Sequence, residues 1–180
     1  MTGDGRRAVF LDRDGVLNRL VMRDGSPSSP RTIEEFEWED GVVEAVERLK
    51  EYGFVNIVAT NQPDIARGKM SEESLKAMTA RVYSDIRIDE VRICPHDDAD
   101  GCICRKPKPG MLLQAVKRWA INCSRSFMVG DSWKDMGAGR AAGCTTILLD
   151  RPHNQGVLCD YRLPGLKEAV ELIIGSERGK

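Results

Sequence analysis

The chain has 180 residues, of which 41% are hydrophobic and 31% are charged, and its formal net charge is -1. This composition is typical of a soluble globular chain long enough for a core of its own, and the charge gives no electrostatic reason to expect nucleic acid or an anionic membrane as a partner. No apolar run approaches the roughly 18 residues of a membrane span, and residues 1–7 lack the apolar centre of a signal peptide. We therefore expect one domain over residues 1–180, with its core at about 7–175, in a monomeric and cytoplasmic protein.

Apolar stretches that predict strands alternate with amphipathic stretches that predict helices. Strands are expected, in chain order, at 8–11, 55–60, 91–94, 126–129, 145–149 and 158–161. Helices are expected at about 41–52, 71–84, 109–120, 133–142 and 164–174. The polar segment 18–39 predicts a long loop, and loops of this length in compact domains are usually functional. Strands that alternate with helices predict an α/β fold, a three-layer sandwich with a central parallel sheet.

Two carboxylates, Asp12 and Asp14, stand two residues apart at the end of the first predicted strand. Strand side chains alternate between faces, so both can point the same way at the carboxyl edge of the sheet, where open α/β sheets bind ligands. Two acids this close repel each other, which indicates a cation, a shared proton or chemistry. An acidic turn is the alternative for this segment alone. A calcium loop is excluded, because it needs an oxygen ligand, a glycine and a Glu where this chain has Val16, Leu17 and Arg23.

Three further polar clusters each follow a predicted strand or the loop after one. They are Thr60-Asn61-Gln62, the segment from Arg105 to Gly110, and the segment from Gly130 to Asp135. Each cluster alone is compatible with a capped turn or a solvated loop. Because the carboxyl ends of parallel strands share one edge of a sheet, we expect the four clusters to meet there.

Four soft metal ligands crowd into eleven residues: Cys94, His96, Cys102 and Cys104. This set suits a closed tetrahedral Zn2+ and hence a structural site, with free thiols on a loop as the alternative. Such a zinc would fix the loop that carries the next two residues, Arg105 and Lys106. The remaining cysteines, at 123, 144 and 159, are expected to be buried structural thiols.

Taken together, the four clusters resemble the motifs of the haloacid dehalogenase superfamily, specifically its phosphatases that begin D-x-D-G, over about residues 7–150. Within it, the chain looks most like the bacterial heptose bisphosphate phosphatases and the related histidinol-phosphate phosphatases. The segments that carry the resemblance are 10–15, 60–68, 94–96, 104–111 and 128–131. The resemblance implies a Rossmann-type core with little or no cap domain and a zinc-bound loop.

The resemblance also implies a Mg2+-dependent phosphatase of small phosphorylated metabolites. Asp12 would be the nucleophile that forms an aspartyl-phosphate, and Asp14 would be the general acid and base. Thr60 and Lys106 would stabilise the transferring phosphoryl group. The metal would be held by Asp12, by Asp131 and at Asp14 by a backbone carbonyl. Asp135 would orient Lys106 or the metal waters.

The leading substrate class is a heptose 1,7-bisphosphate. Asn61, Gln62 and Arg105 are expected to bind substrate, and the second phosphate is expected to meet an arginine of the long loop. The candidates lie in residues 18–31 of that loop and are Arg19, Arg23 and Arg31. The chain departs from the heptose phosphatases in this loop, where they commonly carry Asp-His-Gly-Tyr. It also has Ser132 where they often have a lysine.

Several other interpretations remain open. The chain could hydrolyse histidinol phosphate or another sugar phosphate, or act as a polynucleotide 3′-phosphatase, although the net charge of -1 counts against nucleic acid. From another class, it could be a zinc-stapled binding module without catalysis. Two weaker signals are given structural interpretations: Gly137 and Gly139 are expected to pack a helix on the sheet rather than bind a dinucleotide, and His153 is expected to be a surface residue.

Overall fold

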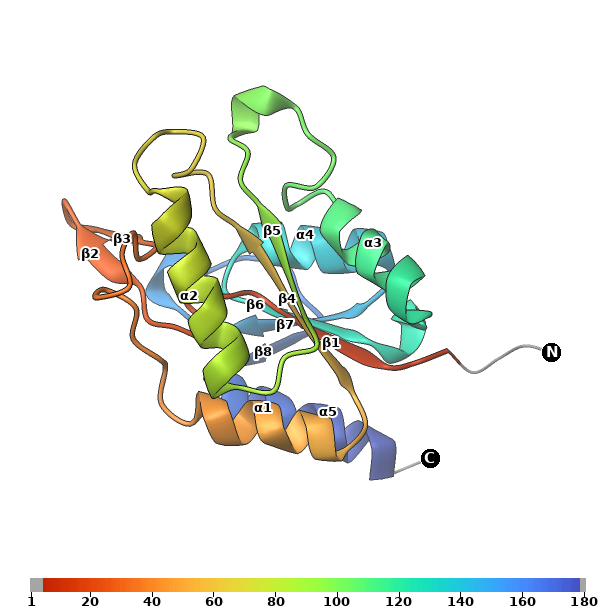
Figure 1. Ribbon diagram of the computed structural model, residues 1–180. Coiled ribbons are helices and arrows are strands. Elements are labelled where there is room, and N and C mark those ends of the chain that lie inside the picture. The colour runs from red at the N-terminus through yellow and green to blue at the C-terminus, as the bar shows by residue number, and fades with distance from the viewer. Residues whose placement is uncertain (1–4, 179–180) are drawn as a thin grey trace.

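Six parallel strands form the central sheet in the order β5-β4-β1-β6-β7-β8 (Figure 1). The computed structural model describes residues 5–178. The strands of this sheet are β1 (Ala8–Leu11), β4 (Val55–Asn61), β5 (Glu90–Cys94), β6 (Phe127–Gly130), β7 (Thr145–Leu149) and β8 (Tyr161–Leu163). The helices are α1 (Val42–Glu51), α2 (Glu72–Asp85), α3 (Gly110–Trp119), α4 (Trp133–Ala142) and α5 (Leu166–Arg178). Short 3-10 turns are η1 (Asp98–Asp100), η2 (Cys123–Arg125) and η3 (Pro152–Asn154).

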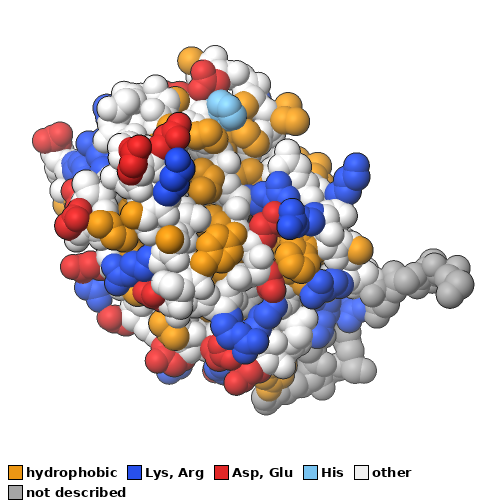
Figure 2. Space-filling view, in the orientation of Figure 1, with side chains coloured by type: hydrophobic (Ala, Val, Ile, Leu, Met, Phe, Trp, Pro, Cys, Tyr) orange, Lys and Arg blue, Asp and Glu red, His pale blue; other side chains and the backbone are white. Residues whose placement is uncertain are grey.

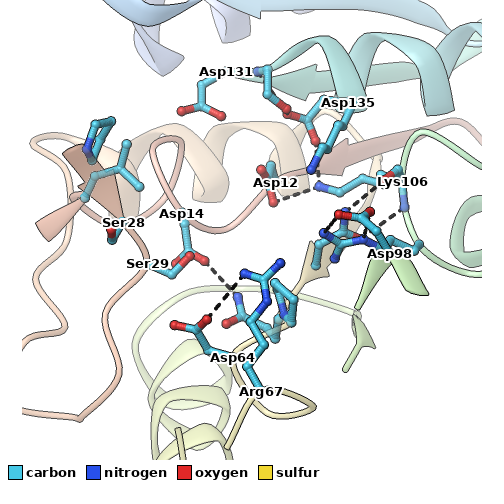
Figure 3. A pocket seen from close by; sticks show the side chains of 18 of the residues that line it. Asp12, Asp14, Ser28, Ser29, Asp64, Arg67, Asp98, Lys106, Asp131 and Asp135 are labelled. Carbon is cyan, nitrogen blue, oxygen red and sulfur yellow. Dashed lines mark hydrogen bonds and ion pairs between the residues drawn. The ribbon is translucent and has the colours of Figure 1, made fainter. Parts of the chain in front are cut away.

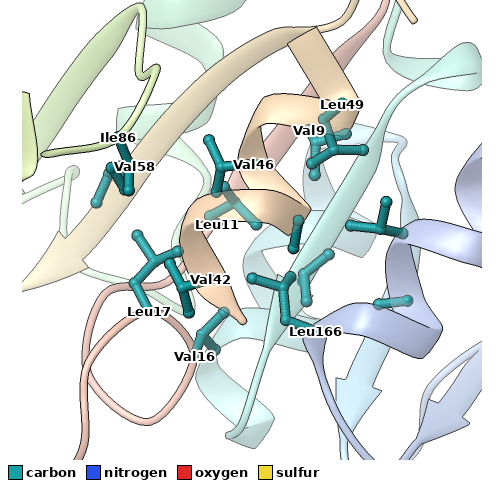
Figure 4. Packing of buried hydrophobic residues seen from close by; sticks show 14 of the residues in the cluster. Val9, Leu11, Val16, Leu17, Val42, Val46, Leu49, Val58, Ile86 and Leu166 are labelled. Carbon is teal, nitrogen blue, oxygen red and sulfur yellow. The ribbon is translucent and has the colours of Figure 1, made fainter. Parts of the chain in front are cut away.

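Each face of the sheet has its own apolar core. Val9 and Leu11 of β1 face α1, α2 and α5, whereas Ala8 and Phe10 face α3 and α4, as the alternation of strand side chains requires. Figure 4 shows the first of these cores, in which Val46 of α1 lies against Leu11. The predicted three-layer sandwich is therefore confirmed.

Strand β1 is the point where the topology of the sheet changes direction. The chain runs from β1 outward through β4 to β5, and then returns to the other side of β1 for β6, β7 and β8. In open α/β sheets the connections diverge at such a point and leave a crevice at the carboxyl ends of the strands. The carboxyl end of β1 carries Asp12 and Asp14.

A small hairpin stands where the sequence predicts a long loop. Strands β2 (Val21–Arg23) and β3 (Ser26–Ser28) pair antiparallel around Asp24 and Gly25, whose φ angles are 49° and 75°. Two positive φ angles in a two-residue Asp-Gly loop are typical of a type I′ hairpin turn. Apart from single 3-10 turns, the hairpin is the one regular element outside the sandwich in residues 5–178, which agrees with the expected near-absence of a cap.

The last strand begins later than the sequence predicts. The carboxylate of Asp160 accepts hydrogen bonds from the backbone N–H and the hydroxyl of Thr146, both at 2.7 Å. Strand pairing starts immediately afterwards, with Tyr161 opposite Ile147. Leu158, which was expected in the strand, is 77% exposed in the preceding loop.

Acidic and basic side chains are interspersed on the face of the molecule shown in Figure 2. Ion pairs of this kind join neighbouring elements, as between Arg87 and Glu47 of α1 at 2.7 Å. Within residues 5–178, no helix combines the length and the hydrophobicity that crossing a bilayer requires.

Two glycines of α4 allow this helix to approach its neighbours closely. A Cβ atom on Gly139 would lie 2.6 Å from Met128 Cβ of β6, and one on Gly137 would lie 2.7 Å from Pro107 Cβ. Real Cβ atoms do not approach this closely, because packed interiors tolerate little added volume. The geometry supports the packing interpretation of this glycine pattern.

We predict opposite effects for two helical glycine substitutions. Gly139→Ala should lower the free energy of unfolding by about 1–3 kcal/mol, because the added methyl group overpacks the interface between α4 and the sheet. Gly175→Ala in α5 is the matched control: nothing lies within 4 Å of its added Cβ, so the better helix propensity of alanine should raise that free energy by about 0.5–1 kcal/mol. Urea denaturation of the two variants measures both changes. Equal changes in the two variants would contradict the packing argument.

Candidate active site

A pocket of ≈ 550 Å³ opens at the carboxyl ends of β1, β4 and β6 (Figure 3). This volume lies within the usual range for small-molecule sites. The residues singled out from the sequence that line it are Asp12, Asp14, Arg31, Asn61, Gln62, Arg105, Lys106, Asp131 and Asp135. The sheet thus brings all four polar clusters together.

The buried ammonium group of Lys106 connects these clusters. Its Nζ lies 2.8 Å from Asp12 Oδ1 and 2.6 Å from Asp135 Oδ1, and it donates to the carbonyl oxygen of Ala59 at 2.7 Å. Burial acts to lower the pKa of Lys106, but the charges of Asp12 and Asp135 outweigh it and raise that pKa above its ordinary value. A fixed positive charge therefore lies beside Asp12.

Asp135 supports both Lys106 and the start of α4. Its second oxygen, Oδ2, accepts hydrogen bonds from Ser132 N at 3.1 Å and from Ser132 Oγ at 2.6 Å. The bond from Ser132 N is the half of a capping box that the third residue of the helix supplies. A Cβ atom on Gly130 would lie 2.2 Å from Asp135 Cβ, so a glycine at that position makes room for the carboxylate. Both oxygens of Asp135 are thereby occupied by protein donors.

Carboxylate oxygens of Asp12, Asp131 and Asp135 lie within 4.8 Å of one another. Burial, followed by the charge of Asp135, raises the pKa of Asp12 well above its ordinary value and that of Asp131 to about 6. Among the described side chains, the buried ammonium of Lys106 is the positive charge that faces all three acids. An excess of negative charge among oxygen donors favours a divalent cation. Because both oxygens of Asp135 are already engaged by Lys106 and Ser132, the carboxylates of Asp12 and Asp131 are the donors that fit Mg2+.

The carboxylate of Asp14 lies outside this cluster and is held by other partners. Arg13 donates to its two oxygens at 2.9 and 3.2 Å, and Gln62 Nε2 donates at 2.7 Å. Burial acts to raise the pKa of Asp14, but the charge of Arg13 and the hydrogen bonds from Arg13 and Gln62 lower it below its ordinary value. The side chain of Asp14 is therefore already engaged by protein donors, which agrees with the expectation that only its backbone carbonyl would contact a metal.

The Thr60-Asn61-Gln62 segment supports the charged residues around it. The side-chain amide of Asn61 exchanges two hydrogen bonds of 3.0 Å with the backbone of Lys106. Gln62 donates to Asp14 and, at 2.8 Å, to the hydroxyl of Thr60. Thr60 itself is buried and does not line the pocket. The amides of Asn61 and Gln62, expected to bind substrate, are thus directed at Lys106 and Asp14.

The segment 151–154 after β7 also reaches the pocket. His153 lines it, with Nε2 3.4 Å from Asp131 Oδ2. The neighbouring Asn154 is buried and donates to the backbone carbonyl of Asp131 at 2.8 Å. His153 is exposed, as expected of a surface residue, and it also lines the pocket beside Asp131. Its proximity follows from the pairing of β7 with β6, which local sequence patterns do not reveal.

The four predicted zinc ligands converge in the loop that follows β5. Cys104 Sγ lies 3.3 Å from Cys94 Sγ, 3.3 Å from His96 Nδ1 and 3.4 Å from Cys102 Sγ, and all four donor atoms lie within 4.8 Å of one another. Zinc–sulfur bonds of about 2.3 Å at tetrahedral angles place ligand atoms roughly 3.8 Å apart. The cluster therefore fits a closed four-coordinate zinc. It directly precedes Arg105 and Lys106.

Of the three arginines proposed from the 18–31 segment, the structure brings Arg31 to the pocket. Arg19 pairs with Asp40 at 2.9 Å, and Arg23 pairs with Glu35. Neither of these two arginines lines the pocket. The sequence could not show which of the three arginines lines the pocket, because their positions depend on how the hairpin folds.

The mouth of the pocket, beyond the acids and lysine around Asp12, carries mostly positive charge. The cationic lining residues there are Arg31, Arg67, Lys69, Arg105 and Lys134, against the two acidic residues Asp64 and Asp98. Arg105 donates to Asp98 Oδ1 at 2.7 Å and to the carbonyl oxygen of His96 at 3.2 Å. Arg67, Lys69 and Lys134 were not foreseen, since charged residues in turns and helix starts are usually solvated. The excess of cations favours an anionic ligand.

Comparison with known proteins agrees with this geometry. Residues 103–155 match a family model described as HAD-hydrolase-like. The D-glycero-beta-D-manno-heptose-1,7-bisphosphate 7-phosphatase of Pasteurella multocida is 39% identical over 155 residues, covering 80% of this chain and 81% of the relative. The enzyme of the same name from Escherichia coli K12 is 38% identical over 156 residues, covering 80% and 78%.

The fold is also similar to that of a solved relative. The structure of D,D-heptose 1.7-bisphosphate phosphatase from B. bronchiseptica, complexed with magnesium and phosphate, superposes with a TM-score of 0.82 at 28% identity, covering 94% of this chain and 99% of the other. With curated relatives at this level of identity over four fifths of its length, the chain belongs to the haloacid dehalogenase family of phosphatases, in the group of the heptose bisphosphate phosphatases.

Proposed function

We propose that this phosphatase removes the phosphate at carbon 7 of D-glycero-D-manno-heptose 1,7-bisphosphate, with Mg2+ as its cofactor. The observation that supports this most is the pairing of two features in one pocket. A carboxylate, Asp12, lies beside the fixed charge of Lys106 and within the acidic cluster with Asp131. Around this centre the mouth is predominantly cationic, which suits a substrate with a second phosphate. The identity of the sugar is inferred from the names of the relatives.

The first half of the reaction takes place at Asp12. A bound Mg2+ would shield the charge of the phosphate oxygens and so permit an anionic nucleophile to approach. An oxygen of Asp12 attacks phosphorus, the phosphorus–oxygen bond to the sugar breaks, and the product is an aspartyl-phosphate on Asp12. Lys106 stabilises the charge on the transferring group, and Asp135 keeps the ammonium in place.

Asp14 is the proton carrier in both halves of the reaction. It donates a proton to the sugar oxygen as that oxygen leaves, and then removes a proton from the water that hydrolyses the aspartyl-phosphate. The hydrogen bonds from Arg13 and Gln62 favour its ionised form, which suits the second half. For the first half, the carboxyl group must turn from Arg13 toward the substrate.

We further propose that the Cys94 cluster binds a structural zinc. The donor set is complete with four soft ligands, which leaves no open position for a reacting water. The metal acts on catalysis indirectly, by fixing the backbone that continues into Arg105 and Lys106.

The substrate assignment is tested with a panel of phosphate esters assayed with Mg2+. We expect kcat/KM for heptose 1,7-bisphosphate to exceed that for heptose 7-phosphate, histidinol phosphate and a 3′-phosphorylated oligonucleotide by roughly tenfold or more, since a second charge-assisted contact contributes on that order. Carbon-7 specificity is verified by identifying the product as the 1-phosphate. A higher kcat/KM for histidinol phosphate would overturn the assignment to a heptose.

The covalent mechanism predicts distinct effects for the two acids of β1. Asp12→Asn should lose activity by about 10⁴-fold or more, because an amide does not attack phosphorus. Asp14→Asn should lose about 10²–10⁴-fold, the usual contribution of a general acid and base. With p-nitrophenyl phosphate, whose leaving group needs no proton, Asp14→Asn should accumulate phosphorylated protein that mass spectrometry detects. Near wild-type turnover by Asp12→Asn would exclude attack by this carboxylate.

The zinc site predicts a metal-dependent stability. Protein purified without chelators should contain about one zinc per chain by elemental analysis. Cys102→Ser should lower both the zinc content and the Tm, because metal binding energy is partly folding energy. Cys159→Ser, which removes a thiol outside the cluster, is the control and should leave the zinc content unchanged. Absence of zinc from the wild-type protein would rule out this site.

A further inference from the structure

A chain of ion pairs connects three loops at the mouth of the pocket. Arg31, which follows the hairpin, donates from Nε to Asp64 Oδ2 at 2.7 Å. The other oxygen of Asp64 lies 3.6 Å from Arg67 Nη1, and Arg67 in turn donates from Nε and Nη2 to Asp97 at 2.7 and 2.6 Å. Asp97 follows the proposed zinc ligand His96. The ion pairs therefore join the hairpin segment, the turn after β4 and the zinc loop.

Three arginines line the pocket, and they differ in which of their nitrogens are engaged. Arg105 uses Nε and both terminal nitrogens on Asp98 and on the His96 carbonyl. Arg67 uses Nε and Nη2 on Asp97, and its Nη1 faces Asp64. Arg31 is bonded through Nε and its backbone N–H, and within residues 5–178 its two terminal nitrogens have no partner.

The side chain of Arg31 is thus held at Nε by Asp64, and its two terminal nitrogens remain available to a ligand. Its backbone is held as well, since Arg31 N donates to Glu35 Oε2 at 2.8 Å and Glu35 is also bound by Arg23. The Arg31 side chain is 29% exposed and that of Asp64 is 17% exposed, so the pair is mostly desolvated. Two parallel terminal N–H groups are the part of a guanidinium that grips a phosphate bidentately.

In Figure 3, Asp64 and Arg67 lie at one end of the pocket and Asp131 at the other, with Asp12 and Asp14 between them. Asp64, to which Arg31 is bonded, thus lies away from the acidic cluster of Asp12 and Asp131, so Arg31 is placed to meet an anionic group of the substrate other than the one that reacts at Asp12. We propose that Asp64 is a specificity-determining positioning residue: it orients Arg31 so that the free guanidinium edge binds the second, non-reacting phosphate of a sugar bisphosphate. The proposal rests on the proposed function for the identity of that ligand.

The two possible roles of Asp64, as a negative charge and as a residue that orients Arg31, predict opposite effects of its removal on anion binding. If its negative charge mattered most, its removal would strengthen the binding of an anion, because a repulsive carboxylate would be lost. If its role is to orient Arg31, removal weakens binding, because the ligand must then immobilise a flexible side chain. The sign of the effect therefore separates the two explanations.

The test measures competitive inhibition of p-nitrophenyl phosphate hydrolysis by heptose 1,7-bisphosphate and by heptose 7-phosphate. In Asp64→Ala, we expect the inhibition constant of the bisphosphate to rise about three- to tenfold, and that of the monophosphate to change less than twofold. Asp64→Asn, which keeps an oxygen acceptor for Arg31 Nε, should fall between wild type and Asp64→Ala. Asp40→Ala is the matched control, because Asp40 pairs with Arg19 outside the pocket lining, and it should change neither constant.

A double variant shows whether the effect passes through Arg31. We expect Arg31→Ala to weaken bisphosphate binding about tenfold or more, and Asp64→Ala to add nothing further in that background. Tighter bisphosphate binding by Asp64→Ala, equal changes for both inhibitors, or additive effects in the double variant would each overturn the proposal. Failure of the proposed function is seen separately, as an absence of phosphate release from carbon 7 by the wild-type protein, since inhibition reports binding whether or not the heptose ester is hydrolysed.

Discussion

The buried ammonium group of Lys106 is the contact on which the rest of the site depends. It lies between Asp12 and Asp135, and its third donor goes to the backbone of β4 at Ala59. Charges buried in this way seldom add net stability, because desolvation offsets their attraction, whereas removing one partner leaves a costly unpaired charge. The arrangement therefore serves the electrostatic surroundings of Asp12 more than the stability of the fold. It also ties the loop that carries Lys106 to β1, β4 and α4 at one point.

Three separate constraints fix the position of Lys106 between Asp12 and Asp135. Asn61 at the end of β4 holds its backbone through two hydrogen bonds. The loop is folded tightly upon itself, since a Cβ atom on Gly110 would lie 2.3 Å from the carbonyl oxygen of Ile103. The proposed zinc ligand Cys104 comes two residues earlier in the chain. A long side chain has many rotamers to lose, so fixing the backbone on both sides of Lys106 is what allows one lysine to meet two acids at once.

Most of the fold and the meeting of the polar clusters in one pocket could be predicted from the sequence, because both have local signals. Apolar strands alternating with amphipathic helices define the sandwich, and the polar residues at strand ends define the pocket. The hairpin was missed although Asp24-Gly25 carries a recognisable turn signal between short strands. The position of His153 in the pocket could not be predicted from the sequence, because it depends on the pairing of β7 with β6. Likewise, the choice of Arg31 over Arg19 depends on the partner that each arginine finds in three dimensions.

The two acids that follow β1 have opposite charge preferences, set by the protein groups around them. Burial and Asp135 raise the pKa of Asp12, whereas Arg13 and Gln62 lower that of Asp14 against the effect of burial. The proposed chemistry needs the reverse at the first step: an ionised Asp12 to attack and a protonated Asp14 to donate. Each required ligand changes the balance in the needed direction, because a divalent cation beside Asp12 favours its ionised form and the phosphate oxygens near Asp14 favour its protonated form. In the proposed reaction, two carboxylates two residues apart would thus acquire different roles from their surroundings, and the pair would be set for reaction with metal and phosphate both bound.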